Sequence, residues 1–168
     1  MRPRHLEPAP GYPPLVGRFV AMTKDARSRL LRDLADLTPD ELDATLPWAP
    51  NSVGTLLYHI AAIELDWVYA DLLLEEFPEA AFEWFPVDVR DDGGTLSPVV
   101  DTPTHHFERL AWVRERLLEA LGTLEDNDLD LSRHEGEESV GVSWILHHLM
   151  QHEAEHRGQI GELRAALG

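Results

Sequence analysis

Four stretches of the chain repeat apolar residues at intervals of three and four positions, the spacing of one face of an α-helix. The first covers residues 14–37, and the second runs from Ser52, which offers an N-cap hydroxyl, to Pro78. The third starts at the Thr102 cap, and the fourth covers residues 139–167. The pattern predicts an all-α protein, a four-helix bundle with a long crossover loop between the second and third helices.

The segments between these stretches predict turns and one long connection. Thr38-Pro39-Asp40-Glu41 has the hydroxyl, the proline and the glutamate of a capping box, so a short helical turn is expected there. Residues 77–100 contain prolines, a Gly93-Gly94 pair and several aromatic residues, which indicates an ordered loop with aromatic anchors. Residues 1–14 form a proline-rich lead, and residues 15–168 are expected to form one bundle domain.

Charge and cysteine content restrict the function. The 168 residues carry 14 basic and 31 acidic side chains, a formal net charge of −17, which repels nucleic-acid phosphates and anionic lipids. No stretch reaches the roughly 18 apolar residues that a membrane span needs, and no signal sequence is recognisable. We therefore expect a cytoplasmic protein with neither nucleic acid nor membrane as a partner. The chain has no cysteine, so any thiol in its chemistry must come from a small molecule.

Histidines on two of the predicted helices suggest a metal site. His152 and His156 are four residues apart, which places both rings on one face with about 6 Å between their Cβ atoms. Ile145 and Leu149 share this face, so it points into the bundle, where unpaired imidazoles would be costly. His59, within the second apolar helix, is the candidate third ligand. Three neutral imidazoles leave a metal with an open coordination position, as in catalytic metal sites.

Polar side chains near these histidines are candidates for supporting roles. Asp66 lies seven residues after His59, on nearly the same line of the helix, and is a candidate hydrogen-bond partner for that ring. Glu153 and His148 are candidate catalytic residues that accept a proton. Gln159 lies on the same helical face as the site and is a candidate substrate-binding residue.

Two aromatic residues of the crossover, Trp84 and Phe85, are candidates for covering an apolar substrate. His147 is turned away from the core line of the fourth helix. The remaining histidines are expected at the surface: His5, His105, His106 and His134.

The string His152-Glu153-Ala154-Glu155-His156 also fits H-E-x-x-H, the zinc-protease signature with glutamate as general base. Such proteases take their third ligand from farther along the chain, but no histidine follows His156. A bundle also lacks the sheet edge that aligns a peptide substrate. The protease interpretation is therefore disfavoured.

The segments NSVGTLLYHI, residues 51–60, and HEAEHRGQI, residues 152–160, resemble the DinB/YfiT-like metal-binding superfamily over residues 15–167. The resemblance implies a bundle with up-down-down-up connectivity in which His59, His152 and His156 hold zinc or nickel. It implies transfer of a low-molecular-weight thiol, such as bacillithiol or mycothiol, to a small electrophile. Glutathione is a further candidate thiol, and a homodimer is compatible with the resemblance.

Four functions remain open from the sequence. The leading interpretation is a metal-dependent thiol S-transferase. A metal-activated water could instead hydrolyse a small ester, amide or lactone at the same site. A third interpretation is a non-catalytic protein that binds a metal or small ligand, and a fourth is a structural bundle whose histidines are paired with other side chains.

Overall fold

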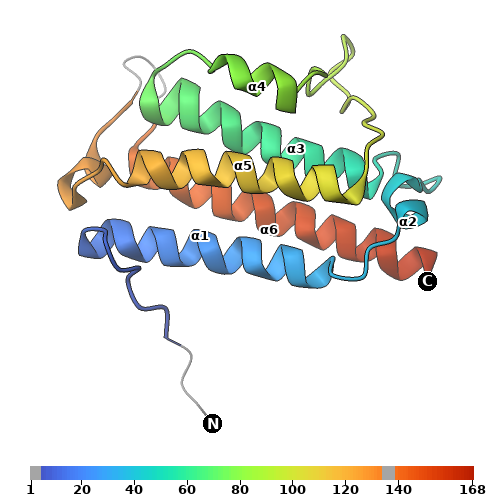
Figure 1. Cartoon of the computed structure of the whole chain (residues 1–168), viewed down its shortest axis with the longest axis horizontal. Helices are drawn as coiled ribbons and strands as arrows, with labels where there is room; N and C mark the ends of the chain where they lie inside the picture. Colours follow the sequence, from blue (N-terminus) through green and yellow to red (C-terminus); the bar gives the residue numbers. More distant parts are fainter. Residues whose placement is uncertain (1–4, 134–138) are drawn as a thin grey trace.

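The computed structural model describes residues 5–133 and 139–168, and four long helices dominate it (Figure 1). These are α1 (Pro14–Asp33), α3 (Val53–Asp66), α5 (Pro103–Leu121) and α6 (Val142–Leu167). Figure 1 shows α1 and α6 running in one direction and α3 and α5 in the other. This is the up-down-down-up order, and the predicted all-α four-helix bundle is confirmed.

Shorter elements join the long helices. They are α2 (Pro39–Asp43), the π-helical segment η1 (Trp67–Leu73), α4 (Glu79–Trp84) and the 3-10 turn η2 (Asp126–Asp130). The crossover between α3 and α5 thus contains a short helix as well as loop. In the described parts of the chain, no helix combines the length and the apolar character needed to cross a membrane.

The predicted starts of α2, α3 and α5 agree with the structure because their capping side chains act as expected. Ser52 accepts a hydrogen bond from the Thr55 amide at 3.2 Å. Thr102 caps α5 in the same way, and Thr38 forms the capping box of α2.

Three other helix boundaries differ from the prediction. The first helix ends at Asp33, and the second gives way to η1, after which Leu74 in the left-handed region, with φ of 58°, stops the helical path before Pro78. The last helix begins at Val142, three residues later than predicted. Leu34, the first residue after α1, is still buried, so the apolar pattern extends beyond the end of the helical backbone.

Part of the proline-rich lead packs back onto α1. The Ala9 amide donates to the Gly17 carbonyl at 2.9 Å. A Cβ atom at position 17 would lie 2.9 Å from the Ala9 carbonyl oxygen, so glycine permits this close approach.

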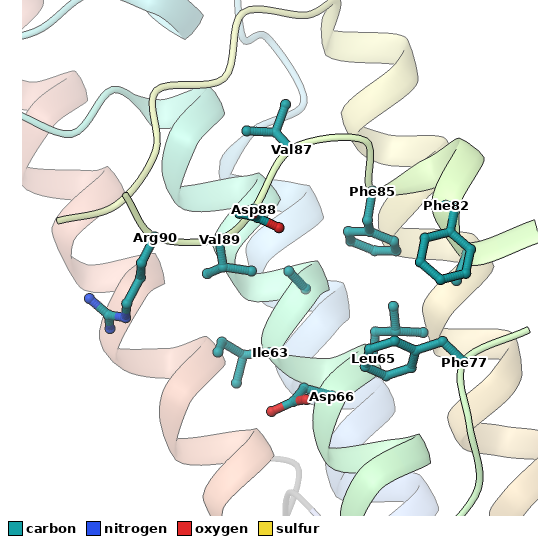
Figure 2. A pocket seen from close by; sticks show the side chains of 12 residues that line it. Ile63, Leu65, Asp66, Phe77, Phe82, Phe85, Val87, Asp88, Val89 and Arg90 are labelled. Atoms are coloured by element: carbon teal, nitrogen blue, oxygen red, sulfur yellow. The ribbon is translucent and has the colours of Figure 1, made fainter. Parts of the chain in front are cut away.

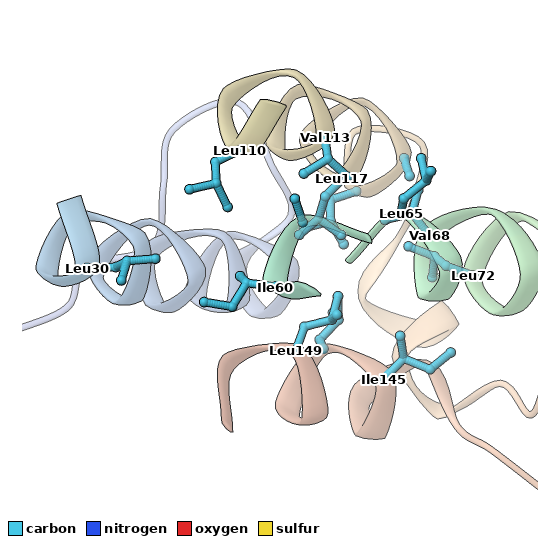
Figure 3. Packing of buried hydrophobic residues seen from close by; sticks show 14 of the residues in the cluster. Leu30, Ile60, Leu65, Val68, Leu72, Leu110, Val113, Leu117, Ile145 and Leu149 are labelled. Carbon is cyan, nitrogen blue, oxygen red and sulfur yellow. The ribbon is translucent and has the colours of Figure 1, made fainter. Parts of the chain in front are cut away.

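Apolar side chains from all four long helices fill the centre of the bundle. Figure 3 shows them converging from α1, α3, η1, α5 and α6. The labelled residues are Leu30, Ile60, Leu65, Val68, Leu72, Leu110, Val113, Leu117, Ile145 and Leu149. Each is at most 5% exposed, so the predicted apolar stripes do form one shared core.

Four charged side chains, one from each long helix, are buried within this core. Arg27 of α1 and Arg114 of α5 each bind both Glu64 of α3 and Glu153 of α6. The four N···O distances are 2.6–2.7 Å. We call this group the ion tetrad. Its two positive and two negative charges balance.

The third nitrogen of each guanidinium in the ion tetrad is also hydrogen-bonded. Arg27 donates to the Leu110 carbonyl at 2.6 Å, and Arg114 donates to the Thr23 carbonyl at 2.7 Å. Because buried charges are tolerated only when paired and hydrogen-bonded, the tetrad fixes the relative rotation of all four helices.

Removing one charge of the ion tetrad should strongly destabilise the fold. In Glu64→Gln the two arginines face a single carboxylate, and breaking a buried pair costs about 3–5 kcal/mol of unfolding free energy. Urea unfolding measures this loss. The matched control is Glu119→Gln, which breaks the exposed Arg116–Glu119 pair and should cost less than about 1 kcal/mol. Equal losses in the two variants would contradict the structural role of the tetrad.

The ion tetrad also predicts how stability depends on pH. Burial raises the pKa of Glu64, but the charges of Arg114 and Arg27 outweigh it, and the net pKa lies below the ordinary 4.5. Such a carboxylate stabilises the fold above its unfolded-state pKa and loses that contribution as pH falls through its folded-state pKa. Below pH 4.5 the wild type should therefore lose more unfolding free energy than Glu64→Gln. Parallel losses in the two proteins would be the contrary result.

The crossover is attached to α3 and α5 by buried polar groups. The Tyr58 hydroxyl pairs with both the amide and the carbonyl of Val87, and Thr55 accepts from the Val99 amide. Arg109 donates to the Trp84 carbonyl at 2.7 Å and lies over the Tyr58 ring. These contacts hold residues 84–99 against α3.

The sequence prediction for His106 is wrong, because this residue is buried and not at the surface. Its ring is 1% exposed, and its Nδ1 lies 3.1 Å from a guanidinium nitrogen of Arg109. Burial, followed by the charge of Arg109, lowers its pKa to about 4. His106 is four residues before Leu110 and therefore begins the buried stripe of α5. His5 is exposed and His105 half-buried, whereas His134 lies outside the described residues.

Candidate metal centre

Three histidines from two helices converge between α3 and α6. His152 Nε2 lies 3.1 Å from His59 Nε2 and 3.0 Å from His156 Nε2. Each ring offers one nitrogen, and these nitrogens all lie within 4.8 Å of one another. His59 is buried on α3, while His152 and His156 on α6 are half-buried, so the cluster lies at the edge of the core. We call these residues the His triad.

The surroundings favour the neutral form of two rings of the His triad, those of His59 and His152. Burial, followed by His156 and Arg90, lowers the pKa of His59 to about 4. Burial, followed by the neighbouring histidines, lowers the pKa of His152 to about 3. A neutral imidazole carries a lone pair on one ring nitrogen, which is the form that binds a metal.

The three imidazole nitrogens of the His triad cannot all be hydrogen-bonded to one another. Each nitrogen of a neutral ring has either one proton or one lone pair, yet His152 Nε2 has two imidazole nitrogens within 3.1 Å. One divalent ion accepts all three lone pairs at once. Two nitrogens that are each about 2.0–2.1 Å from one ion lie about 3.0–3.4 Å apart. The distances from His152 to His59 and to His156, 3.1 and 3.0 Å, fit such an ion.

Gln159 orients one ring of the His triad. Its Oε1 atom lies 2.9 Å from His156 Nδ1, so the ring donates its proton there and its Nε2 keeps the lone pair. The sequence had suggested substrate binding for Gln159. The structure shows that its amide oxygen contacts a ligand candidate directly.

His59 lacks the partner that the sequence predicted for it. Among the described residues, its buried Nδ1 has no hydrogen-bond partner, and Asp66 does not reach it. Asp66 is instead exposed and lines a neighbouring pocket. The helical line through residues 59 and 66 is correct, but seven residues span two turns, about 10.5 Å along the axis, which is too far for a hydrogen bond.

The two candidate proton acceptors lie in different surroundings. Both carboxylate oxygens of Glu153 are bound to arginines of the ion tetrad, so this side chain points away from the His triad into the core. That position does not support a role in proton transfer. His148 lies closer to the site: its ring centroid is 5.9 Å from that of His152, and it stacks on Trp144 at 5.0 Å.

An apolar pocket of about 420 Å³ lies beside the His triad, farther along α3 (Figure 2). Ala62 and Ile63 of its wall follow His59 by one helical turn. Phe77, Phe82 and Phe85 provide aromatic surface, as Figure 2 shows. We call this cavity the apolar pocket. Its complete lining is Ala62, Ile63, Leu65, Asp66, Phe77, Ala81, Phe82, Phe85, Val87, Asp88, Val89 and Arg90.

The two aromatic residues predicted to cover a substrate have different positions. Phe85 lines the apolar pocket and packs edge-on against Tyr58. Trp84 lies outside the pocket lining and stacks on Trp112 of α5 with ring centroids 6.0 Å apart. The structure therefore leaves Phe85 as the better candidate.

The sequence did not indicate Arg90, which lines the apolar pocket and lies close enough to His59 for its charge to act on that ring. The Arg90 side chain extends toward α6 in Figure 2, and its charge contributes to the lowered pKa of His59. A short hairpin holds it, in which Asp91 accepts from the amides of Gly93 and Thr95. No sequence signal marks Arg90, because its position depends on how the crossover folds back over α3.

The sequence prediction also did not include the ion tetrad, although the sequence contains a signal for it. Arg114 lies between Leu110 and Leu117 on the buried face of α5, and Glu64 follows Ile60 by four residues on α3. A charged residue on an apolar stripe indicates a buried partner of opposite charge.

Together, an up-down-down-up four-helix bundle and three histidines from two of its helices define a DinB/YfiT-like protein with a candidate metal centre. Residues 18–168 match the mycothiol S-transferase family. The chain belongs to this family, and the resemblance to the DinB/YfiT-like superfamily is confirmed.

Comparison with solved structures supports the fold. A conserved protein from Enterococcus faecalis superposes with a TM-score of 0.70, and the match covers 87% of this chain and 92% of that one. Its sequence identity is 21%, so it supports the shared fold alone. A comparison with curated proteins found no match.

Metal binding by the His triad should be measurable on protein purified without an affinity tag. We expect one divalent ion per chain by elemental analysis, because three imidazole nitrogens converge on one point. His152→Ala should abolish binding. The matched control is His147→Ala, an exposed histidine on the same helix, which should keep the metal. Equal loss in both variants, or wild-type protein that binds no metal, would contradict the site.

Gln159→Leu tests whether the contact with His156 matters for metal binding. Without the amide acceptor the His156 ring loses its preferred orientation and proton position, so metal affinity should fall about 10–100-fold. Competition with a chromogenic chelator measures this affinity. Gln159→Glu keeps an acceptor at the same place and should retain affinity, and a loss in both variants would show that the contact is not the cause.

Proposed function

We propose that this protein is a metal-dependent S-transferase that joins a low-molecular-weight thiol to a small apolar electrophile at the His triad. The observation that carries the proposal is the convergence of three imidazoles together with an apolar pocket whose wall begins one helical turn after His59. Family membership supports thiol chemistry, with mycothiol as the first thiol to test. The absence of cysteine fits a thiol that is supplied from outside the chain.

His59, His152 and His156 are the proposed metal ligands, and the donor set suits zinc or nickel. A bound divalent ion would lower the pKa of a thiol and so favour the thiolate. The residues of this chain would supply the rest: Gln159 orients the ligand ring of His156, and Phe85 with Ile63 holds the electrophile out of water.

The proposed reaction forms one carbon–sulfur bond. The thiol loses its proton to a ring nitrogen of His148, and the sulfur then donates an electron pair to the electrophilic carbon. In a substitution the leaving group departs with its bonding pair and His148 releases the proton to solvent, whereas in an addition His148 returns the proton to the product. His148 suits this role because its ring lies 5.9 Å from that of His152, between centroids, and because its stacking on Trp144 holds the ring in place.

A conjugation assay tests the proposed function. Mycothiol, bacillithiol and glutathione are each incubated with an apolar aromatic electrophile, with metal-loaded protein and after chelation. We expect metal-dependent turnover with at least one thiol and none with His152→Ala. Turnover that needs metal but no thiol would favour hydrolysis by metal-activated water instead. The absence of any metal-dependent product would reject catalysis and favour a binding protein.

His148→Phe tests the proposed proton acceptor without removing the ring that stacks on Trp144. Because general-base catalysis contributes 10²- to 10⁴-fold, kcat should fall at least about 100-fold while KM for the electrophile changes little. Added imidazole should restore part of the rate. A kcat close to that of wild type would exclude His148 from this role.

A further inference from the structure

A second pocket lies on the other side of His59 along α3 from the apolar pocket, since its lining includes Leu56, one turn before His59. It has a volume of about 320 Å³ and lies where the connection between α2 and α3 meets the last turns of α6. Gln159 lines it, and the same side chain is hydrogen-bonded to His156. A ligand in this cavity would therefore lie one side chain from the proposed metal ligands. We call it the polar pocket, and its lining is Trp48, Ala49, Pro50, Asn51, Leu56, Gln159, Glu162 and Leu163.

Trp48 is presented by a tight turn at the edge of the polar pocket. Leu46 and Ala49 exchange two backbone hydrogen bonds of 2.9 and 3.1 Å, which leaves Trp48 in the turn between them. The indole is 61% exposed. The other four tryptophans contact another aromatic ring, but within the described residues Trp48 has no such partner. Its exposed apolar surface lacks a role in packing.

The polar groups of this pocket can both donate and accept hydrogen bonds. Asn51 and Gln159 carry amides, and Glu162 carries a carboxylate. After Gln159 Oε1 has bonded to His156, its NH2 group keeps two donors. Buried Leu56 and Leu163 form the apolar part of the lining. An exposed indole beside amides suits a ring with one apolar C–H face and a rim of hydroxyl groups.

The two pockets differ in charge and polarity, and each therefore favours a different kind of ligand. The lining of the polar pocket contains Glu162 and no basic residue, so a carboxylate-bearing ligand would be repelled. The apolar pocket offers mainly hydrocarbon surface, where hydroxyl groups would lose their hydrogen bonds with water. Its one cation, Arg90, lies at the end near the His triad.

We propose that the polar pocket binds the uncharged, polyhydroxylated body of the thiol cosubstrate, with Trp48 packing on a sugar ring and Asn51 and Gln159 bonding its hydroxyls. The assignment rests on the proposed function, and it adds that the thiol and the electrophile occupy separate pockets on either side of His59 along α3. Trp48 and Asn51 then select the thiol, while Phe85 and its neighbours select the electrophile.

The test is a titration followed by NMR on the full-length, isotope-labelled protein, with methyl glucoside as a neutral sugar and S-methylglutathione as a charged, sugar-free thiol derivative. We expect methyl glucoside to shift the signals of the Trp48 indole N–H and of the Asn51 and Gln159 side-chain amides. S-methylglutathione should leave them unchanged. Trp48→Ala should weaken glucoside binding about tenfold, because it removes the largest contact surface.

Two further variants serve as controls. Asn51→Leu keeps the size of the side chain, removes the amide and should also weaken glucoside binding. Phe82→Ala removes a similarly exposed aromatic ring, 66% exposed, from the apolar pocket and should not. The exposed positions of Trp48 and Phe82 favour folded variants, which the dispersion of the same spectra verifies.

Several results would overturn the assignment: shifts confined to the apolar pocket, no shift at the highest soluble glucoside concentration, or stronger binding of S-methylglutathione in the polar pocket. The titration requires neither metal nor turnover, so it is separate from the test of the proposed function. Sugar binding in the polar pocket without thiol transfer would support a sugar site there and reject the transferase. Thiol transfer whose KM for the sugar thiol is unaffected by Trp48→Ala would reject the pocket assignment alone.

Discussion

The ion tetrad at the centre of the bundle is the interaction on which the candidate site depends. A metal centre built from two helices requires those helices to keep a fixed distance and rotation, and apolar packing alone tolerates some sliding. Glu64 of α3 and Glu153 of α6 bind the same two guanidinium groups, so the two helices that carry the His triad are tied to common partners. The charges balance, which makes their burial acceptable in the core.

The H-E-x-x-H string takes on a different meaning in this fold. His152 and His156 share one side of α6, while Glu153, rotated by 100° from His152, faces the core and binds Arg27 and Arg114. The glutamate that would be the general base of a zinc protease is here a structural brace between two proposed ligands. Because consecutive helical residues face different directions, His152 lies at the candidate metal centre while Glu153 lies in the core. In our proposal the proton acceptor is therefore His148.

Much of the fold was predictable because it follows from local rules. The caps at Ser52 and Thr102, the apolar stripes and the four-residue spacing of His152 and His156 are all determined within one helix. His59 was found because a histidine on an apolar stripe is conspicuous. The burial of His106 and the ion tetrad depend on which faces meet in three dimensions. The pockets depend on the crossover and on the turn that carries Trp48, whose positions are set by contacts distant in sequence, such as that between Tyr58 and Val87.

The central claim is that three imidazoles hold one divalent ion and leave it able to accept a thiol. X-ray absorption spectroscopy of the metal-loaded protein tests this directly, before and after the addition of mycothiol. For zinc we predict imidazole nitrogens at about 2.0–2.1 Å in the free protein and one additional sulfur neighbour at about 2.3 Å once the thiol is present. A spectrum without imidazole scattering, or one that shows no sulfur at saturating thiol, would contradict the claim.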